Sequence, residues 1–260
     1  MVLRMVVGLV LTAVAFAVAG RRVWWLGRLA FSGQPAPERL EYARRHPGRE
    51  AETQLTEVIG QRKLLRWSIP GAAHAGVFWG FLVLLLTIIE AYGALFQRDF
   101  AIPVIGKSAA VGLIEDIFAV AVLVALAVFT VIRLANSPAR LDRRSRFYGS
   151  HVDQAFIVLG MIFLVIATLL LYRGAQISAG YFPYQDEGWW AFASKATSYL
   201  TPNSEAFETV FIVAQIAVVM GFLVLVLYSK HMHIFTAPLN VFLKRQPKAL
   251  GALEIGRAHV

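Results

Sequence analysis

The sequence predicts an all-α integral membrane fold in which five transmembrane helices form an antiparallel bundle. Of its 260 residues, 58% are hydrophobic and only 16% are charged, so the chain is far more apolar than a soluble domain. Apolar runs long enough to cross a bilayer recur along it, and Lys and Arg gather in alternate loops. The absence of cysteine excludes disulfides, thiolate zinc sites and cysteine-held iron–sulfur clusters within these residues.

The apolar runs define the expected helices. A transmembrane helix needs about twenty mostly apolar residues, and such runs predict spanning helices at residues 5–19, 69–92, 113–134, 155–172 and 209–228. The first run follows Arg4 and ends in small residues at 17–20, a pattern that is also typical of a cleaved signal peptide. We favour a retained helix, because cleavage would export the most basic loop of the chain.

The basic residues predict the orientation of the bundle. Lys and Arg together number ten in residues 21–68, two in 93–112, four in 135–152, two in 173–208 and four in 229–248. Basic loops stay on the cytoplasmic side of a membrane. The N-terminus is therefore expected outside and the C-terminus inside. The net charge of +9 follows from this topology rather than from nucleic-acid binding.

The first cytoplasmic loop, residues 21–68, predicts two short surface helices. They are expected at 37–45 and 49–65, with a break at the His-Pro-Gly sequence of 46–48. Both segments carry acidic and basic residues. Such mixed charges indicate a solvated face, and a docking surface for a partner domain is the alternative.

The expected outer end of the bundle carries aromatic and acidic side chains. The loop 181–198 predicts an interfacial aromatic anchor formed by Trp189, Trp190 and Phe192. Four acids are expected at the outer helix ends: Glu90, Glu115, Asp116 and Glu208. Acids in such places are more often solvated than engaged in proton relay, so we expect these four to be solvated.

Four histidines are expected at the cytoplasmic helix ends: His74, His151, His231 and His233. Ionisable side chains in a bilayer are costly and therefore candidates for function, although a helix-end histidine can simply bond a carbonyl near the headgroups. Small residues within 71–80 surround His74 and would let a flat macrocycle or a neighbouring helix approach. His231 and His233 would lie about 200° apart on one helix, so they are expected to point in opposite directions.

Two neutral imidazoles from different helices at one depth suit the axial ligation of haem b. Low-spin iron takes two strong ligands, and the porphyrin needs an apolar slot. Arg66 and Lys230 lie in the sequence where they could meet the haem propionates, although extension to lipid headgroups would explain them as well.

Two motifs carry a family resemblance. The first is Leu65-Arg66-Trp67 followed by His74, and the second is the stretch 231–238 with the sequence His-Met-His-Ile-Phe-Thr-Ala-Pro. Both resemble motifs of the membrane cytochrome b subunit of respiratory nitrate reductase, its gamma subunit. Relatives of that subunit are fused to heterodisulfide-reductase-type iron–sulfur domains, and they fit better. The resemblance covers most of the chain and implies a haem-binding bundle of five helices.

By this resemblance His74 and His233 would be the axial ligands of a haem b near the cytoplasm. His231 and His151 are alternate ligands, which a second cytoplasmic-side haem or a quinone pocket would use. The family's outer haem has its histidines where this chain offers Leu84 and Gln215, so that haem is expected to be missing.

The resemblance also implies a function and a location. The chain would pass electrons between a cytoplasmic iron–sulfur domain or subunit and the membrane quinone, with an electron-transfer flavoprotein as a further candidate donor. The direction of flow stays open, and the location implied is the bacterial cytoplasmic membrane. The main alternative is a cofactor-free membrane anchor for a cytoplasmic oxidoreductase domain. A transporter is less favoured, because such proteins bind their cargo near the midplane through broken helices.

The last seven residues of the chain do not resemble natural protein sequence. Residues 254–260 resemble the translation of a sequencing adapter, so we interpret 1–253 as the membrane cytochrome b domain. An iron–sulfur domain is expected downstream of it. Iron–sulfur clusters would then lie only in that domain or in a partner.

Overall fold

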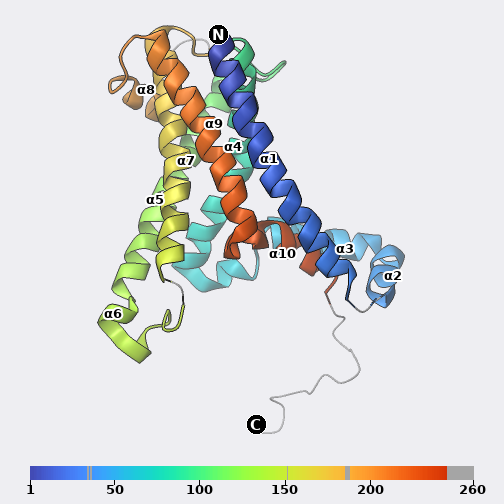
Figure 1. The fold of residues 1–260 in the computed structure, drawn as a ribbon. Coiled ribbons are helices and arrows are strands. Elements are labelled where there is room, and N and C mark those ends of the chain that lie inside the picture. The colour runs from blue at the N-terminus through green and yellow to red at the C-terminus, as the bar shows by residue number, and fades with distance from the viewer. Residues whose placement is uncertain (34, 36, 151, 185–187, 245–260) are drawn as a thin grey trace, which may run out of the picture.

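The computed structural model describes residues 1–33, 35, 37–150, 152–184 and 188–244. Within these residues the protein is built from helices, and five of them are long and apolar enough to cross a membrane, which confirms the predicted architecture (Figure 1). They are α1 (Val2–Phe31), α4 (Ser68–Phe96), α5 (Ala109–Ala135), α7 (Val152–Ala179) and α9 (Glu205–Tyr228).

Shorter helices connect and cover these five. They are α2 (Pro37–Arg45), α3 (Pro47–Thr53), η1 (Gln54–Ile59), η2 (Leu64–Trp67), α6 (Pro138–Leu141), η3 (Asp142–Arg144), η4 (Trp189–Ala191), α8 (Phe192–Ser198), η5 (Lys230–Met232) and α10 (His233–Phe242). We call the end of the bundle at which α1 begins the upper end, and the end that carries α2, α3 and α10 the lower end (Figure 1).

The long helices extend beyond the apolar runs that predict them. Helix α1 continues to Phe31, so the loop expected from residue 21 begins only at Ser32. The guanidinium of Arg22, inside this extension, lies over the rings of Trp25 and Tyr228 and donates to the carbonyl of Leu227 at 3.3 Å. These contacts hold the lower part of α1 against the end of α9.

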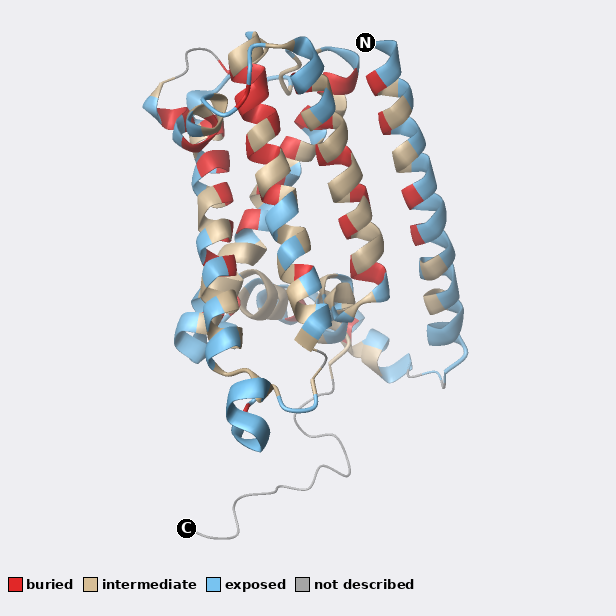
Figure 2. Ribbon diagram, turned by 60° about the vertical axis from the view of Figure 1, so that its left-hand side comes forward, coloured by how far each residue is buried: buried red, intermediate tan, exposed pale blue. Residues whose placement is uncertain are grey.

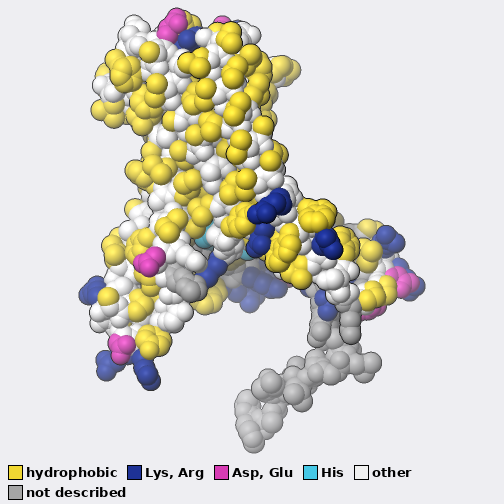
Figure 3. All heavy atoms as spheres, in the orientation of Figure 1, with side chains coloured by type: hydrophobic (Ala, Val, Ile, Leu, Met, Phe, Trp, Pro, Cys, Tyr) yellow, Lys and Arg dark blue, Asp and Glu magenta, His cyan; other side chains and the backbone are white. Residues whose placement is uncertain are grey.

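Close helix packing depends on small residues at the crossing points. A Cβ on Gly80 of α4 would lie 2.4 Å from the Val122 side chain of α5, and one on Gly8 of α1 would lie 2.7 Å from Leu95 of α4. Buried residues face the bundle interior, whereas α1 turns a largely exposed face outward (Figure 2). Many of the exposed side chains on the long helices are apolar (Figure 3), as a lipid-facing surface requires.

The loop between α1 and α4 contains the two expected helical segments, of which one matches the expected bounds, followed by the short turn η2. Helix α2 covers 37–45 as predicted, but the second segment begins at Pro47 rather than at 49 and ends at Ile59 rather than at 65. Proline is favoured in the first helical turn because its missing N–H has no partner there in any case. The second segment packs against α10, where Gln54 Nε2 donates to the carbonyl of Pro238 at 2.9 Å.

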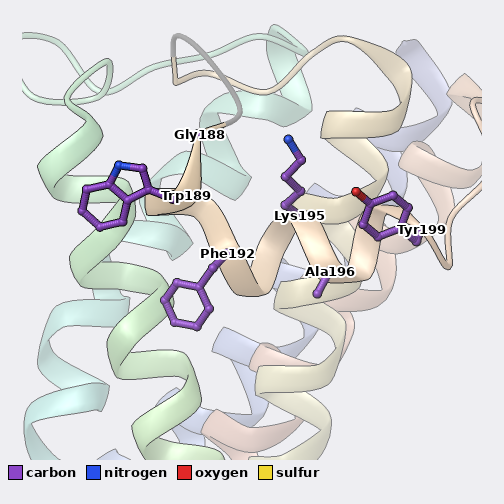
Figure 4. Close-up of a pocket in the computed structure, with 6 residues that line it drawn as sticks. All are labelled: Gly188, Trp189, Phe192, Lys195, Ala196 and Tyr199. Atoms are coloured by element: carbon purple, nitrogen blue, oxygen red, sulfur yellow. The ribbon is translucent and has the colours of Figure 1, made fainter.

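The connection between α7 and α9 corrects one member of the predicted aromatic anchor. Trp189 and Phe192 are exposed and flank a shallow hollow beside Lys195 and Tyr199 (Figure 4). Trp190 is buried instead, because Gly112 of α5 leaves room for its indole, which a Cβ at residue 112 would meet at 2.6 Å. Trp190 therefore belongs to the core and not to the anchor.

Enlarging Gly80 should destabilise the bundle. Gly80→Val would force the stiff Val122 side chain or the α4–α5 crossing to move, and overpacking of this kind costs about 1–3 kcal/mol. Thermal unfolding in detergent would detect it as a lower midpoint. Gly160→Val is the matched control, since a Cβ on Gly160 would meet nothing within 4 Å. Equal midpoints for the two variants would contradict the proposed crossing.

Candidate functional site

The chain changes direction between α9 and α10, which places two histidines side by side. Helix α9 ends at Tyr228, and Ser229 is extended with φ −124° and ψ 178°. The Ser229 hydroxyl then accepts from the backbone N–H of His231 at 3.2 Å, and α10 begins at His233. Helix α10 crosses the lower end instead of prolonging α9 (Figure 1).

This turn corrects the expected orientation of His231 and His233. On one regular helix the two side chains would point in opposite directions. Their ring centroids are in fact 5.6 Å apart, because the chain leaves the α-helix at Ser229 and passes through a short 3₁₀ turn. Both histidines therefore belong to one cluster, and spacing alone does not exclude either from a shared ligand.

His74 of α4 completes this cluster from another part of the chain. The centroids of the His74 and His233 rings are 6.2 Å apart, and the ring planes are inclined by 43°. Two imidazoles on opposite sides of one metal ion, with metal–nitrogen bonds of ~2 Å, would have centroids roughly 6 Å apart. The structure thus brings the two predicted ligands together at a spacing compatible with one shared iron.

Hydrogen bonds define the tautomers of these two rings. His74 Nδ1 lies 3.1 Å from Oε1 of Gln61, and His233 Nδ1 lies 3.2 Å from the carbonyl oxygen of Lys230. Because both partners are oxygen acceptors, each ring carries its hydrogen on Nδ1 and leaves the Nε2 lone pair available. Metal-ligating histidines commonly have their second nitrogen held in this way.

Gln61 is a component of the site that no sequence motif indicates. It lies between η1 and η2, is 3% exposed, and has a φ of +48°, which residues other than glycine rarely adopt. This conformation brings its side chain to His74, thirteen residues further along the chain. Gly60 marks a break before it, but no spacing pattern in the sequence connects a loop glutamine to a helix histidine.

The small residues around His74 serve different purposes. A Cβ on Gly71 would lie 2.0 Å from the carbonyl oxygen of Leu64, and Gly80 is needed for contact with α5. Helix and loop packing therefore explain these two. Gly76 has nothing within 4 Å of its Cβ position, so it alone of the three leaves space beside the backbone.

The other residues predicted to belong to the site are Arg66, Lys230, His231 and His151. Arg66 and Lys230 are exposed at the lower end, where Figure 3 shows histidine side chains in a hollow with basic side chains nearby. Burial lowers the pKa of the His231 imidazole, and His233 lowers it further, so His231 is neutral at pH 7. Its Nδ1 is buried and lacks a hydrogen-bond partner. His151 lies outside the described residues, as does the segment 254–260.

Leu84 and Gln215, which stand where the resemblance would place further histidines, are buried in the bundle. Leu84 packs in a cluster with residues of α5 and α7, such as Val122 and Leu169. Gln215 is buried and accepts a hydrogen bond from the hydroxyl of Thr168. Side chains from neighbouring helices therefore surround both positions.

The acids at the upper end are buried rather than solvated, which corrects the expectation. All four are at most 5% exposed: Glu90, Glu115, Asp116 and Glu208. Their cationic partners are arginines, namely Arg4 of α1, Arg173 of α7 and Arg98, which follows α4. Arg4 donates to both oxygens of Glu208, at 2.9 and 3.0 Å, and Arg98 bonds the same carboxylate. Charges buried in a low-dielectric interior must be paired, and the sequence pattern around Arg4 indicates only a possible signal peptide and not this ion pair.

Arg173 is the centre of a second buried group. It belongs to α7 rather than to the following loop, and its Nη1 lies 2.7 Å from Glu115 and 3.5 Å from Glu90. Asp116 accepts from the backbone N–H groups of Ala193 and Ser194 at 2.8 and 2.9 Å. These contacts connect α4, α5, α7 and α8 at the upper end.

Comparison of the chain with protein-family models, with curated proteins and with solved structures found no match. The resemblance therefore rests on the two histidine motifs alone. Among the described residues, no group of three or more His, Cys, Asp or Glu side chains is arranged to hold a metal ion. A haem iron needs only two axial ligands from the protein, because the porphyrin supplies the others.

Removing Arg4 should destabilise the bundle. Breaking a buried ion pair leaves an uncompensated charge and costs about 3–5 kcal/mol, and we expect the lower figure for Arg4→Met because Glu208 keeps Arg98. Arg21→Met, at an exposed position of the same helix, is the control. Chemical or thermal unfolding in detergent measures both. A loss no larger for Arg4→Met than for Arg21→Met would argue against the buried pair.

Proposed function

We propose that this protein is a haem b membrane domain that transfers electrons between a cytoplasmic iron–sulfur partner and the membrane quinone pool. The observation that carries the proposal is the pairing of His74 and His233. The two rings come from separate helices, lie 6.2 Å apart, and each has its Nδ1 on an oxygen acceptor. A helix-end histidine that only bonded a carbonyl would not need a second ring at this spacing.

The orientation belongs to the same proposal. Ten Lys and Arg lie in residues 21–68, of which the described part runs from the lower half of α1 to the start of α4. Basic segments stay in the cytoplasm, so the lower end would face inward and the N-terminus outward. The His74–His233 pair would then lie on the side where a soluble electron donor or acceptor can approach.

The residues present fit a haem in several respects. His74 and His233 would hold the iron, and Gln61 would orient His74. Arg66 and Lys230, both exposed at the lower end, are the candidates for the propionates. Gly76 leaves the backbone of α4 open beside His74. When bound, the haem supplies one-electron chemistry, and the protein contributes its position and potential.

Histidine variants test the proposal directly. Membranes that contain the full-length protein should show a reduced-minus-oxidised spectrum typical of b-type haem, with the haem counted per polypeptide. His74→Ala and His233→Ala should each abolish haem incorporation, because a single remaining imidazole cannot provide both axial ligands. His231→Ala should retain it.

His46→Ala is the matched control for these variants. His46 is exposed, stacks on Tyr42, and lies outside the three-histidine cluster, so its removal should leave the spectrum unchanged. If haem is retained in His233→Ala but lost in His231→Ala, the axial ligand is His231 and not His233. A protein that folds and inserts but never shows a Soret band would favour the cofactor-free anchor instead.

Gln61 offers a second, independent test. Gln61→Leu removes the acceptor of the His74 Nδ1 hydrogen, and loss of such a partner typically costs 10–100-fold in metal affinity. We expect weaker haem retention during purification and a shifted reduction potential, measured by redox titration. Gln97→Leu, at an exposed glutamine of the upper end that bonds Asp99, serves for comparison. Identical haem retention and potential in the Gln61 variant and the wild type would count against its role.

A further inference from the structure

The buried group around Arg173 contains more hydrogen-bond contacts than its hydrogens can supply if every acid is ionised. Tyr184 Oη lies 2.5 Å from Oε1 of Glu90 and 2.7 Å from Oε2 of Glu115. A phenol has one hydrogen and can donate it to one of these oxygens. The other contact needs a hydrogen from the carboxyl group itself, so one of the two acids must be protonated.

The surroundings of the two acids identify which one holds this hydrogen. Glu115 receives a charge-assisted bond from Arg173 at 2.7 Å, whereas the contact between Arg173 and Glu90 is 3.5 Å. Asp116, the third acid, accepts from two backbone N–H groups and from the hydroxyl of Ser194. Glu90 therefore has the weakest support for a negative charge.

The balance of charge in this group also requires a neutral acid. One guanidinium, that of Arg173, faces three carboxyl groups, and like charges so close cannot all persist in a dry interior. Glu115 Oε1, Arg173 Nη2 and the hydroxyl of Tyr172 are buried without hydrogen-bond partners. Arg4 and Arg98 are committed to Glu208 and do not compensate this group.

We propose that Glu90 is a proton-binding site: a carboxylic acid, buried at the upper end, that donates its hydrogen to the oxygen of Tyr184 while Tyr184 donates to Glu115. Burial raises the pKa of the Tyr184 phenol, and Glu90 and Glu115 raise it further, so the phenol keeps its own hydrogen. The chain Glu90–Tyr184–Glu115 then has one hydrogen for each contact. The site does not depend on haem binding.

Isosteric substitutions separate a protonated Glu90 from an ionised one. Glutamine resembles the neutral acid, so Glu90→Gln should keep the thermal midpoint of the wild-type protein in detergent. Glu115→Gln removes the carboxylate that pairs with Arg173 and should lower the midpoint clearly or prevent folding. Equal losses in the two variants would overturn the proposal.

Infrared spectroscopy provides the second readout. At neutral pH the wild-type protein should show the carbonyl band of a protonated carboxylic acid, which shifts in D₂O. The band should disappear in Glu90→Gln and remain in Glu205→Gln, the control at an exposed acid. A wild-type protein without this band, or a Glu90→Gln protein that retains it, would refute the assignment.

Discussion

The cost of burying charge in an apolar bundle determines how the upper end of this protein is built. Arg4, Arg98 and Arg173 come from three different parts of the chain, and each pairs with a carboxylate on a helix to which it does not belong. Because breaking a buried ion pair is expensive, these contacts restrict how the helices can shift against one another. They also join α1, which is otherwise largely exposed, to α9. The upper end is thus closed by polar contacts that an apolar core alone would not supply.

Among the described residues, the lower end is held together by a loop and a crossing helix rather than by buried ion pairs. In the view of Figure 1, α1 and α5 lie further apart there than at the upper end, and α10 crosses between the helix ends. The loop segment η1 bonds α10 through Gln54, and the same loop continues to Gln61, which contacts His74. His233 begins α10. The loop between α1 and α4 therefore contacts both His74 and the helix that begins with His233.

The sequence predicted the parts of the fold that depend on local properties. Five spanning helices follow from apolar runs, and α2 follows from helix-favouring residues between breaks. The expected helix ends select four histidines, the family resemblance implies the pair His74 and His233, and the structure brings those two rings together. What could not be predicted depends on distant partners or on irregular backbone. The ion pair of Arg4 joins residues 204 positions apart, and the side-by-side placement of His231 and His233 follows from the extended Ser229.

The pairing of Arg4 with Glu208 also constrains how the protein is made. Of the five long helices, α1 leaves the ribosome first and α9 last, yet each carries one half of a buried ion pair. Until α9 is synthesised, the guanidinium near the start of α1 has no access to that carboxylate. Final closure of the bundle is therefore a late event in biogenesis, when the newest span docks against the oldest.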